Sequence, residues 1–215
     1  MTPFIFDCDG TLVETHKDIA ASARHVCERL GIPPVDEAII PGYMGLGIDH
    51  LLRRILGDHG DRFDEARRLY MAHHDNHCTD RSRLYDGAIE LLDALRSRGC
   101  RLGLLSNKTE HFCRIILEKL DVAHRFDLIY GSDSTPWKKP DCRGLLQLAG
   151  RLGGSDALYI GDSSIDIDTA HAARARFPGM RVGFVEHGYG RVETEKPDYT
   201  WSDLRALLKW VESGA

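Results

Sequence analysis

Short apolar runs recur along the chain, and turn residues bound each of them. Runs of this length suit buried strands and are too short for helices. They fall at residues 4–6, 102–105, 128–130, 158–160 and 182–185. Helix-like segments lie between most of them, at residues 87–97, 110–120, 142–152 and 165–174. This alternation predicts an α/β fold, with a Rossmann-like parallel-sheet core covered by helices on both faces.

One interval, from residue 15 to residue 84, breaks this rhythm. It shows only helical patterns, at residues 18–30, 48–56 and 64–77. A parallel crossover needs only about a dozen residues, so the excess predicts an inserted helical module. We therefore expect residues 1–14 and 85–215 to form the core and residues 15–84 to form a helical cap. The two connections, near residues 13–15 and 80–86, should then lie side by side as a hinge.

Composition and charge exclude some classes of partner but do not identify an activity. The 215 residues carry a formal net charge of -5, which gives no support to nucleic-acid binding through a basic face. No apolar run is long enough to span a membrane, and no secretory signal is visible at the N-terminus. The six cysteines form no CxxC pair, which favours free thiols in a reducing compartment. We expect a cytoplasmic protein with no membrane partner and no nucleic-acid partner.

Polar side chains follow four of the predicted strands. In open parallel sheets, ligands bind outside the carboxyl ends of the strands, so these residues should share one edge. Carboxylates are ligands for Mg²⁺, whereas hydroxyl and lysine donors bind phosphate. The pattern therefore predicts a cation site beside an anion site. In chain order the residues are Asp7 and Asp9, then Ser106, Asn107 and Lys108, then Lys138 and Lys139, and finally Asp162 and Asp166.

These segments resemble a known family. FDCDGTL, LLSNK, KKP and GDSSID are similar, in order, to the four motifs of the haloacid dehalogenase-like superfamily, and the long helical insertion resembles its helical cap. The resemblance spans roughly residues 4–189. It is strongest to the phosphoglycolate phosphatase branch, through DGTLVET, the stretch with Gly45 and Gly47, LYDGAIELLDALRSRG and VEHGYG. Ile165, where Asn is commoner, and KPDC, where KPxP is frequent, depart from the pattern without removing a charged group.

The resemblance implies a Mg²⁺-dependent phosphatase that hydrolyses a small phosphate monoester, with 2-phosphoglycolate as the best candidate, through an aspartyl-phosphate. It implies that Asp7 attacks phosphorus and that Asp9 serves as general acid and base. If extended geometry persists, their spacing of two places both carboxylates on one side. The resemblance also implies that Mg²⁺ sits on Asp7, the main-chain carbonyl of Asp9, and Asp162, with Asp166 in a supporting role.

The same resemblance implies how a small phosphorylated metabolite would be held. Ser106, Asn107 and Lys139 would bind the phosphoryl group. Lys139 is chosen over Lys138 because the lysine of the family directly precedes proline. Because glycine adopts conformations closed to other residues, Gly45 and Gly47 would let the cap loop approach the site, although a simple turn is an alternative.

Other functions remain open at this point. A sugar phosphomutase, a pyrophosphatase or a nucleotidase would use the same core, and a phosphorylatable signalling domain would use similar residues without catalysis. The second acid, Asp9, favours turnover over signalling. A phosphomutase needs a second phosphate site, for which Arg53 and Arg54 are the close candidates, although a solvated helix face is the favoured interpretation. His73 and His77 have a spacing that suits zinc, but a solvent-facing helix is again favoured.

Overall fold

A parallel sheet forms the centre of the fold. The computed structural model describes residues 2–193 and 195–214, so the outer limits of the expected core, residues 1 and 215, lie outside the described part. Within it, all strand pairs of this sheet are parallel, in the order β5-β4-β1-β6-β7-β8. The strands are β1 (Phe4–Phe6), β4 (Leu102–Leu105), β5 (Leu128–Tyr130), β6 (Asp156–Gly161), β7 (Gly179–Val185) and β8 (Tyr199–Trp201).

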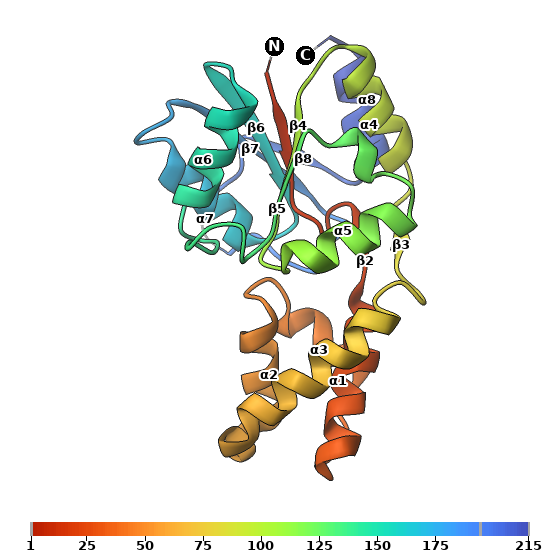
Figure 1. Ribbon diagram of the computed structural model, residues 1–215. Coiled ribbons are helices and arrows are strands. Elements are labelled where there is room, and N and C mark those ends of the chain that lie inside the picture. The colour runs from red at the N-terminus through yellow and green to blue at the C-terminus, as the bar shows by residue number, and fades with distance from the viewer. Residues whose placement is uncertain (1, 194, 215) are drawn as a thin grey trace.

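Helices cover both faces of the sheet, which confirms the predicted α/β class (Figure 1). Phe4 and Phe6 point into one buried apolar cluster, and Ile5 points into the other, as the period of two in a strand requires. The helices on the Phe4 face are α4 (Ala88–Ser97), α5 (Glu110–Lys119) and α8 (Leu204–Glu212), and those on the Ile5 face are α6 (Arg143–Leu152) and α7 (Ser164–Ala173).

The sequence pattern predicted five of these strands and missed β8. Tyr199 and Thr200 are exposed, because β8 lies at the edge of the sheet, so no buried run marks it. Helix α8, which follows β8, was also missed, although its apolar positions follow a helical period. Strand β8 extends the sheet beyond β7, away from β1 and β6, the strands that precede Asp7 and Asp162.

Residues 16–77 form mainly helices, which lie below the sheet in Figure 1. They have an apolar cluster of their own, whose fully buried members include Leu52 and Ile40. The helices are α1 (His16–Leu30), α2 (Ile48–Leu56) and α3 (Phe63–His77), joined by the short 3₁₀ segments η1 (Glu37–Tyr43) and η2 (Gly57–Arg62). A third such segment, η3 (Ala123–Arg125), precedes β5.

The two connections of this insertion lie side by side. They pair as an antiparallel two-stranded sheet, β2 (Val13–Glu14) with β3 (Arg83–Leu84). Asp18, in the first turn of α1, is buried beside them, and its carboxylate accepts hydrogen bonds from Arg81 N and from both N and Oγ of Ser82. One carboxylate therefore ties the start of the insertion to its end.

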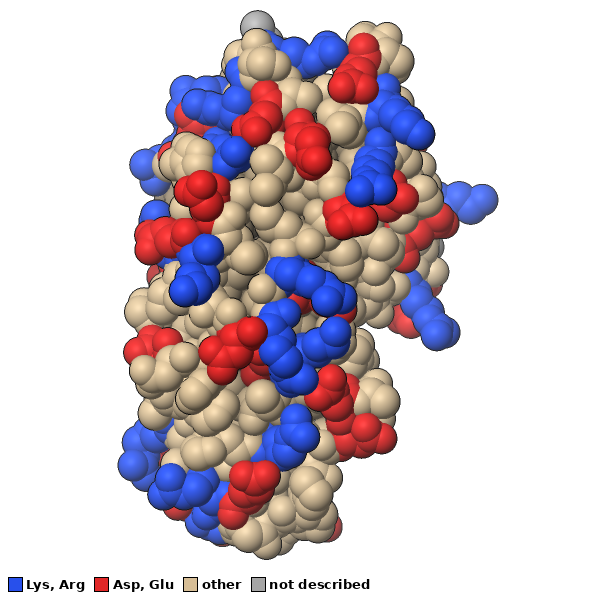
Figure 2. Space-filling view, turned by 90° about the vertical axis from the view of Figure 1, so that its right-hand side faces the viewer, with Lys and Arg blue, Asp and Glu red and all other residues tan. Residues whose placement is uncertain are grey.

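The surface carries charges of both signs. On the face drawn in Figure 2, small groups of lysine and arginine side chains are bordered by acidic ones. Arg83, for example, pairs with Glu14. In the described residues, no helix has the length and apolar character needed to cross a membrane. The cysteines are free thiols, as predicted.

We predict that Asp18→Ala destabilises the protein by about 2–4 kcal/mol, because it leaves buried main-chain N–H groups without an acceptor. Urea unfolding measures the change. Asp49→Ala is the matched control, because Asp49 also lies in the first turn of a helix but forms only an exposed ion pair with Arg67. It should cost less than about 0.5 kcal/mol. Equal losses in the two variants would contradict the structural role given to Asp18.

Candidate active site

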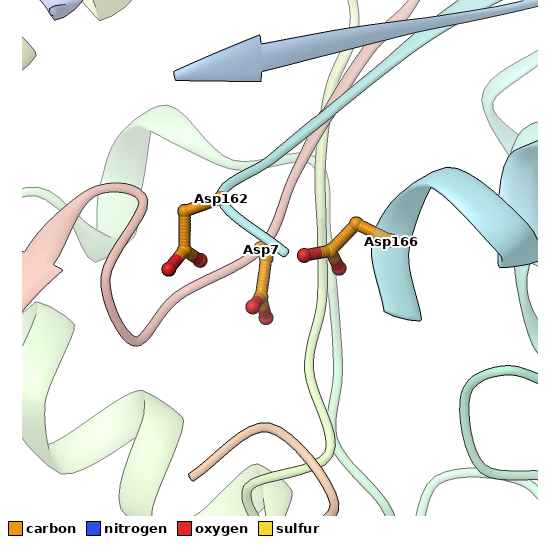
Figure 3. Close-up of side chains that lie close together, drawn as sticks. All are labelled: Asp7, Asp162 and Asp166. Carbon is orange, nitrogen blue, oxygen red and sulfur yellow. The ribbon is translucent and has the colours of Figure 1, made fainter. Parts of the chain in front are cut away.

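Three buried carboxylates meet at the carboxyl end of the sheet. Asp7 follows β1 and Asp162 follows β6, and these strands are neighbours, so their ends meet at one edge. Asp166 reaches the same point from the first turn of α7. Each residue offers an oxygen within 4.8 Å of the others, and Figure 3 shows the three carboxylates gathered around one space. This placement agrees with the cation site expected from the strand ends.

Asp166 is fully engaged by the protein. Its Oδ1 accepts hydrogen bonds from Lys139 Nζ (2.7 Å) and Tyr159 Oη (2.8 Å). Its Oδ2 accepts bonds from N and Oγ of Ser163. The bond from Ser163 N is one half of a capping box at the start of α7, in which the Ser163 side chain accepts from the main-chain N–H of Asp166. Although burial opposes the shift, Lys139 lowers the pKa of Asp166. Asp166 therefore stays charged and fixes Lys139 in place.

Asp7 and Asp162 carry charge that the protein compensates less well. Burial raises the pKa of Asp7 to about 6, and burial together with the charges of Asp166 and Asp7 raises the pKa of Asp162 to about 7. Lys139 Nζ lies 2.9 Å from Asp7 Oδ1, yet this buried oxygen accepts no hydrogen bond of good geometry. One lysine thus faces three carboxylates. A divalent cation with oxygen ligands fits this donor set and would supply the missing positive charge.

The glycine of the DG step is required by close packing against Asp162. Gly10 has φ +85°, and a Cβ at this position would lie 2.4 Å from Asp162 Oδ2. The chain therefore turns away from β1 immediately after Asp9, so that Thr11 Oγ1 can donate to Asp162 Oδ1 (3.0 Å). Main-chain N–H groups of Tyr189 and Gly190 bond the other oxygen of Asp162.

Asp9 lies beside the cluster of three aspartates but is not one of its members. Strand β1 ends at Phe6, so the extended geometry that would align the Asp9 side chain with that of Asp7 is not kept. Asp9 Oδ1 instead accepts a hydrogen bond from Thr15 Oγ1 (2.6 Å), and Oδ2 lies 3.3 Å from Lys108 Nζ. Asp7 and Asp9 still line the same cavity.

The residues after β4 occupy different positions around this cavity. Ser106 is buried and lines it. Asn107 also lines it, but its side-chain amide donates to the carbonyls of Gly45 (2.8 Å) and Lys139 (2.9 Å), while its Oδ1 accepts from Lys139 N. The Asn107 side chain therefore holds three segments together, and only its main chain remains for a ligand.

A cavity of about 90 Å³ separates the sheet edge from the insertion. The core contributes the acids and the residues after β4, and the insertion contributes mostly apolar walls. The loop of Gly45 and Gly47 closes one side, with φ of +94° and +86°. A Cβ on Gly47 would lie 3.0 Å from Asn107 O, so this loop approaches the site closely.

Other candidates from the sequence lie away from the cavity. Arg53 stacks on Phe63 and Arg54 on Tyr43, and neither arginine is among the described residues that line the cavity. The rings of His73 and His77 stack with centroids 4.4 Å apart. Among the described residues, the three aspartates form the only group whose ligand atoms converge as a metal site requires.

Sequence reasoning did not find several supporting residues. Tyr159 lies within β6 and gave no signal, because a tyrosine in a buried strand suits packing alone. Thr15 gave none either, since its bond to Asp9 crosses a turn. Ser163 could have been found, because a serine three residues before Asp166 is the pattern of a helix cap.

We predict that Lys139→Met lowers the free energy of unfolding by about 3–5 kcal/mol when measured with EDTA present, because it leaves the buried acids without their cation. Urea unfolding measures the loss. Lys138→Met is the matched control, since Lys138 is exposed, and it should change stability by less than about 0.5 kcal/mol. A loss below about 1 kcal/mol for Lys139→Met would show that the acids do not depend on it.

Comparisons with known proteins agree with this geometry. Residues 4–180 match the family described as haloacid dehalogenase-like hydrolase. The chain is 35% identical to a phosphoglycolate phosphatase of Cereibacter sphaeroides, over 97% of this chain and all of that protein. It is 34% identical to one of Pseudomonas putida, over 95% of this chain and 77% of that protein.

Solved structures give the same result. The crystal structure of a predicted phosphoglycolate phosphatase from Haemophilus somnus superposes with a TM-score of 0.88, at 28% identity and 98% coverage of both chains. A haloacid dehalogenase-like family hydrolase from Streptococcus pneumoniae superposes with a TM-score of 0.82, at 26% identity and 98% coverage of both chains. Together with its four strand-end motifs, these matches establish that the chain belongs to the haloacid dehalogenase-like hydrolase family.

Proposed function

We propose that the protein is a Mg²⁺-dependent phosphatase that hydrolyses 2-phosphoglycolate or a closely similar small phosphate monoester. The observation that carries the proposal is the cavity of about 90 Å³ over Asp7, Asp9 and Ser106. It is small for a ligand pocket, so it suits a phosphoryl group with a leaving group of few atoms. The names of the relatives support this choice of substrate.

The first half of the reaction uses Asp7 and Asp9. An oxygen of Asp7 attacks phosphorus, the bond from phosphorus to the ester oxygen breaks, and Asp9 gives its proton to the departing oxygen. This sequence divides one difficult displacement into two easier ones. Asp9 suits the role because its carboxylate lines the cavity beside Asp7 and is positioned by Thr15.

The second half releases phosphate. Asp9, now ionised, takes a proton from water, the water oxygen attacks phosphorus, and the bond between phosphorus and Asp7 breaks. Ser106 Oγ and the main chain of Asn107 hold the phosphoryl oxygens, and Lys139 keeps the adjacent charges balanced. Asp7, Asp162 and the main-chain carbonyl of Asp9 would hold Mg²⁺, with Asp166 in support, and the cation supplies positive charge against the phosphoryl oxygens.

We propose that residues 15–84 act as a cap over a core formed by residues 1–14 and 85–215. The paired connections β2 and β3 support this division, as does the separate apolar cluster of the helices. In this arrangement the cap keeps bulk water from the site during transfer. A sugar phosphomutase is disfavoured, because its cap must hold a second phosphate, and no lysine or arginine of residues 15–84, Arg53 and Arg54 included, lines the cavity.

We predict that Asp7→Asn lowers phosphatase activity by about 1,000-fold or more, because an amide is a poor nucleophile. Asp9→Asn should also slow turnover, but it should accumulate phosphoenzyme when the substrate is an aryl phosphate with a good leaving group. Rapid quenching followed by intact-protein mass spectrometry detects the added phosphoryl group. A wild-type phosphoenzyme that persists for minutes would favour a signalling domain, and normal turnover by Asp9→Asn would remove the acid–base role.

We predict that Mg²⁺ at 100 times its dissociation constant raises the Tm of the wild type by about 5 °C or more, because it binds only the folded site. Asp162→Asn should lose most of this shift. Asp58→Asn, which changes an exposed aspartate, should keep it. Differential scanning calorimetry measures the shifts, and equal shifts in all three proteins would place the cation elsewhere.

A further inference from the structure

Lys108 is a buried cation to which the proposed chemistry gives no role. It follows Ser106 and Asn107 at the end of β4, and its side chain is only 6% exposed. Although burial opposes the shift, the carboxylate of Asp9, 3.3 Å away, raises the pKa of Lys108. The ammonium therefore pairs with the carboxylate that, in the proposed mechanism, protonates the leaving group.

Lys108 is also the only lysine or arginine among the described residues that line the cavity. Three aspartates line the same space, so a second negative charge on a substrate would be repelled unless it reached a cation. Apolar and aromatic side chains line the rest of the cavity. They include Ile19, Leu51, Tyr70 and Phe112.

Two polar atoms beside Lys108 have unused hydrogen-bonding capacity. Thr109 Oγ1 and His74 Nε2 are buried at the cavity, and neither has a hydrogen-bond partner among the described residues. Ser22 Oγ donates to the carbonyl of Asp18, so in this network it accepts from His74 Nδ1 (2.9 Å), which leaves a lone pair on Nε2. Burial and the charge of Lys108 lower the pKa of His74. The ring is therefore neutral, and Lys108 supplies the positive charge alone.

We propose that Lys108, assisted by the hydroxyl of Thr109, binds a carboxylate on the leaving group and so selects phosphate esters of small 2-hydroxy acids. This inference rests on the proposed phosphatase function. In such an ester the carboxylate is one carbon away from the ester oxygen. A leaving group whose ester oxygen meets Asp9 therefore brings its carboxylate to Lys108, and the apolar walls leave space for little more. If Lys108 served only to set the charge of Asp9, it would matter equally for every substrate.

The test compares two substrates that differ in this one group. We would measure kcat/KM for 2-phosphoglycolate and for 2-hydroxyethyl phosphate, which has a hydroxymethyl group in place of the carboxylate. Lys108→Met should lower the preference for 2-phosphoglycolate by about 10- to 100-fold, the worth of a hydrogen bond to a charged group. Lys108→Arg should keep part of the preference, and the exposed control Lys138→Met should keep all of it. An equal loss on both substrates would overturn the proposal.

A binding measurement separates this inference from the proposed function. Calorimetric titration of Asp7→Asn with each ester, with Mg²⁺ present, reports affinity without turnover. If Asp7→Asn binds 2-phosphoglycolate more tightly than 2-hydroxyethyl phosphate, and Asp7→Asn/Lys108→Met does not, the carboxylate site is supported. This conclusion holds even if the wild type hydrolyses neither ester, because the absence of hydrolysis would refute only the phosphatase proposal. Equal binding of both esters, or no binding of either, overturns the inference. Lys108→Gln replaces Lys108→Met if circular dichroism shows that the methionine variant is not folded.

Discussion

The confinement of three carboxylates in one buried space is the constraint on which the rest of the site depends. Like charges at this distance repel strongly when water is excluded, so the fold must supply compensation from several directions. It does so with the ammonium of Lys139, with Ser163 at the N-terminus of helix α7, and with main-chain N–H groups from the loop of Tyr189. Each of these elements comes from a different part of the chain, so the whole core must be assembled before the acids can be held together.

The three carboxylates are not stabilised equally by hydrogen bonds and ion pairs, and the difference bears on their chemical roles. Asp166 accepts four hydrogen bonds, and, although burial opposes the shift, Lys139 lowers its pKa. Asp7 receives fewer hydrogen bonds, because its buried Oδ1 lies 2.9 Å from Lys139 Nζ but accepts no hydrogen bond of good geometry. A carboxylate that accepts few hydrogen bonds keeps lone pairs available for a metal ion or for phosphorus. In the proposed mechanism Asp7 supplies the reactive oxygen, and Asp166 holds Lys139 in place.

The sequence was sufficient to place those residues of the candidate site that directly follow a strand, because a simple geometric rule relates strand ends to one another. Residues that follow parallel strands must share an edge, so Asp7, Ser106 and Asp162 could be placed together from the apolar runs alone. The rule does not predict the positions of side chains in the loops that follow the strands. It could not show that the chain turns at Gly10 and carries the Asp9 side chain toward Thr15, or that the amide of Asn107 is used to join three segments. Those features depend on loop paths, which spacing in the sequence does not specify.

The pairing of β2 with β3 has a further consequence for how the chain folds. Loop-closure entropy grows only slowly with the number of residues between two joined points, so a long insertion adds little to the free energy of holding its ends together. Because Val13 pairs directly with Leu84, the two ends leave the core as neighbouring strands of one ladder. The whole insertion therefore connects β2 to β3 in the way that a turn connects the two strands of a hairpin. Its length and internal structure can therefore change without moving β1 or β4, whereas the strands that carry the acids tolerate no such change.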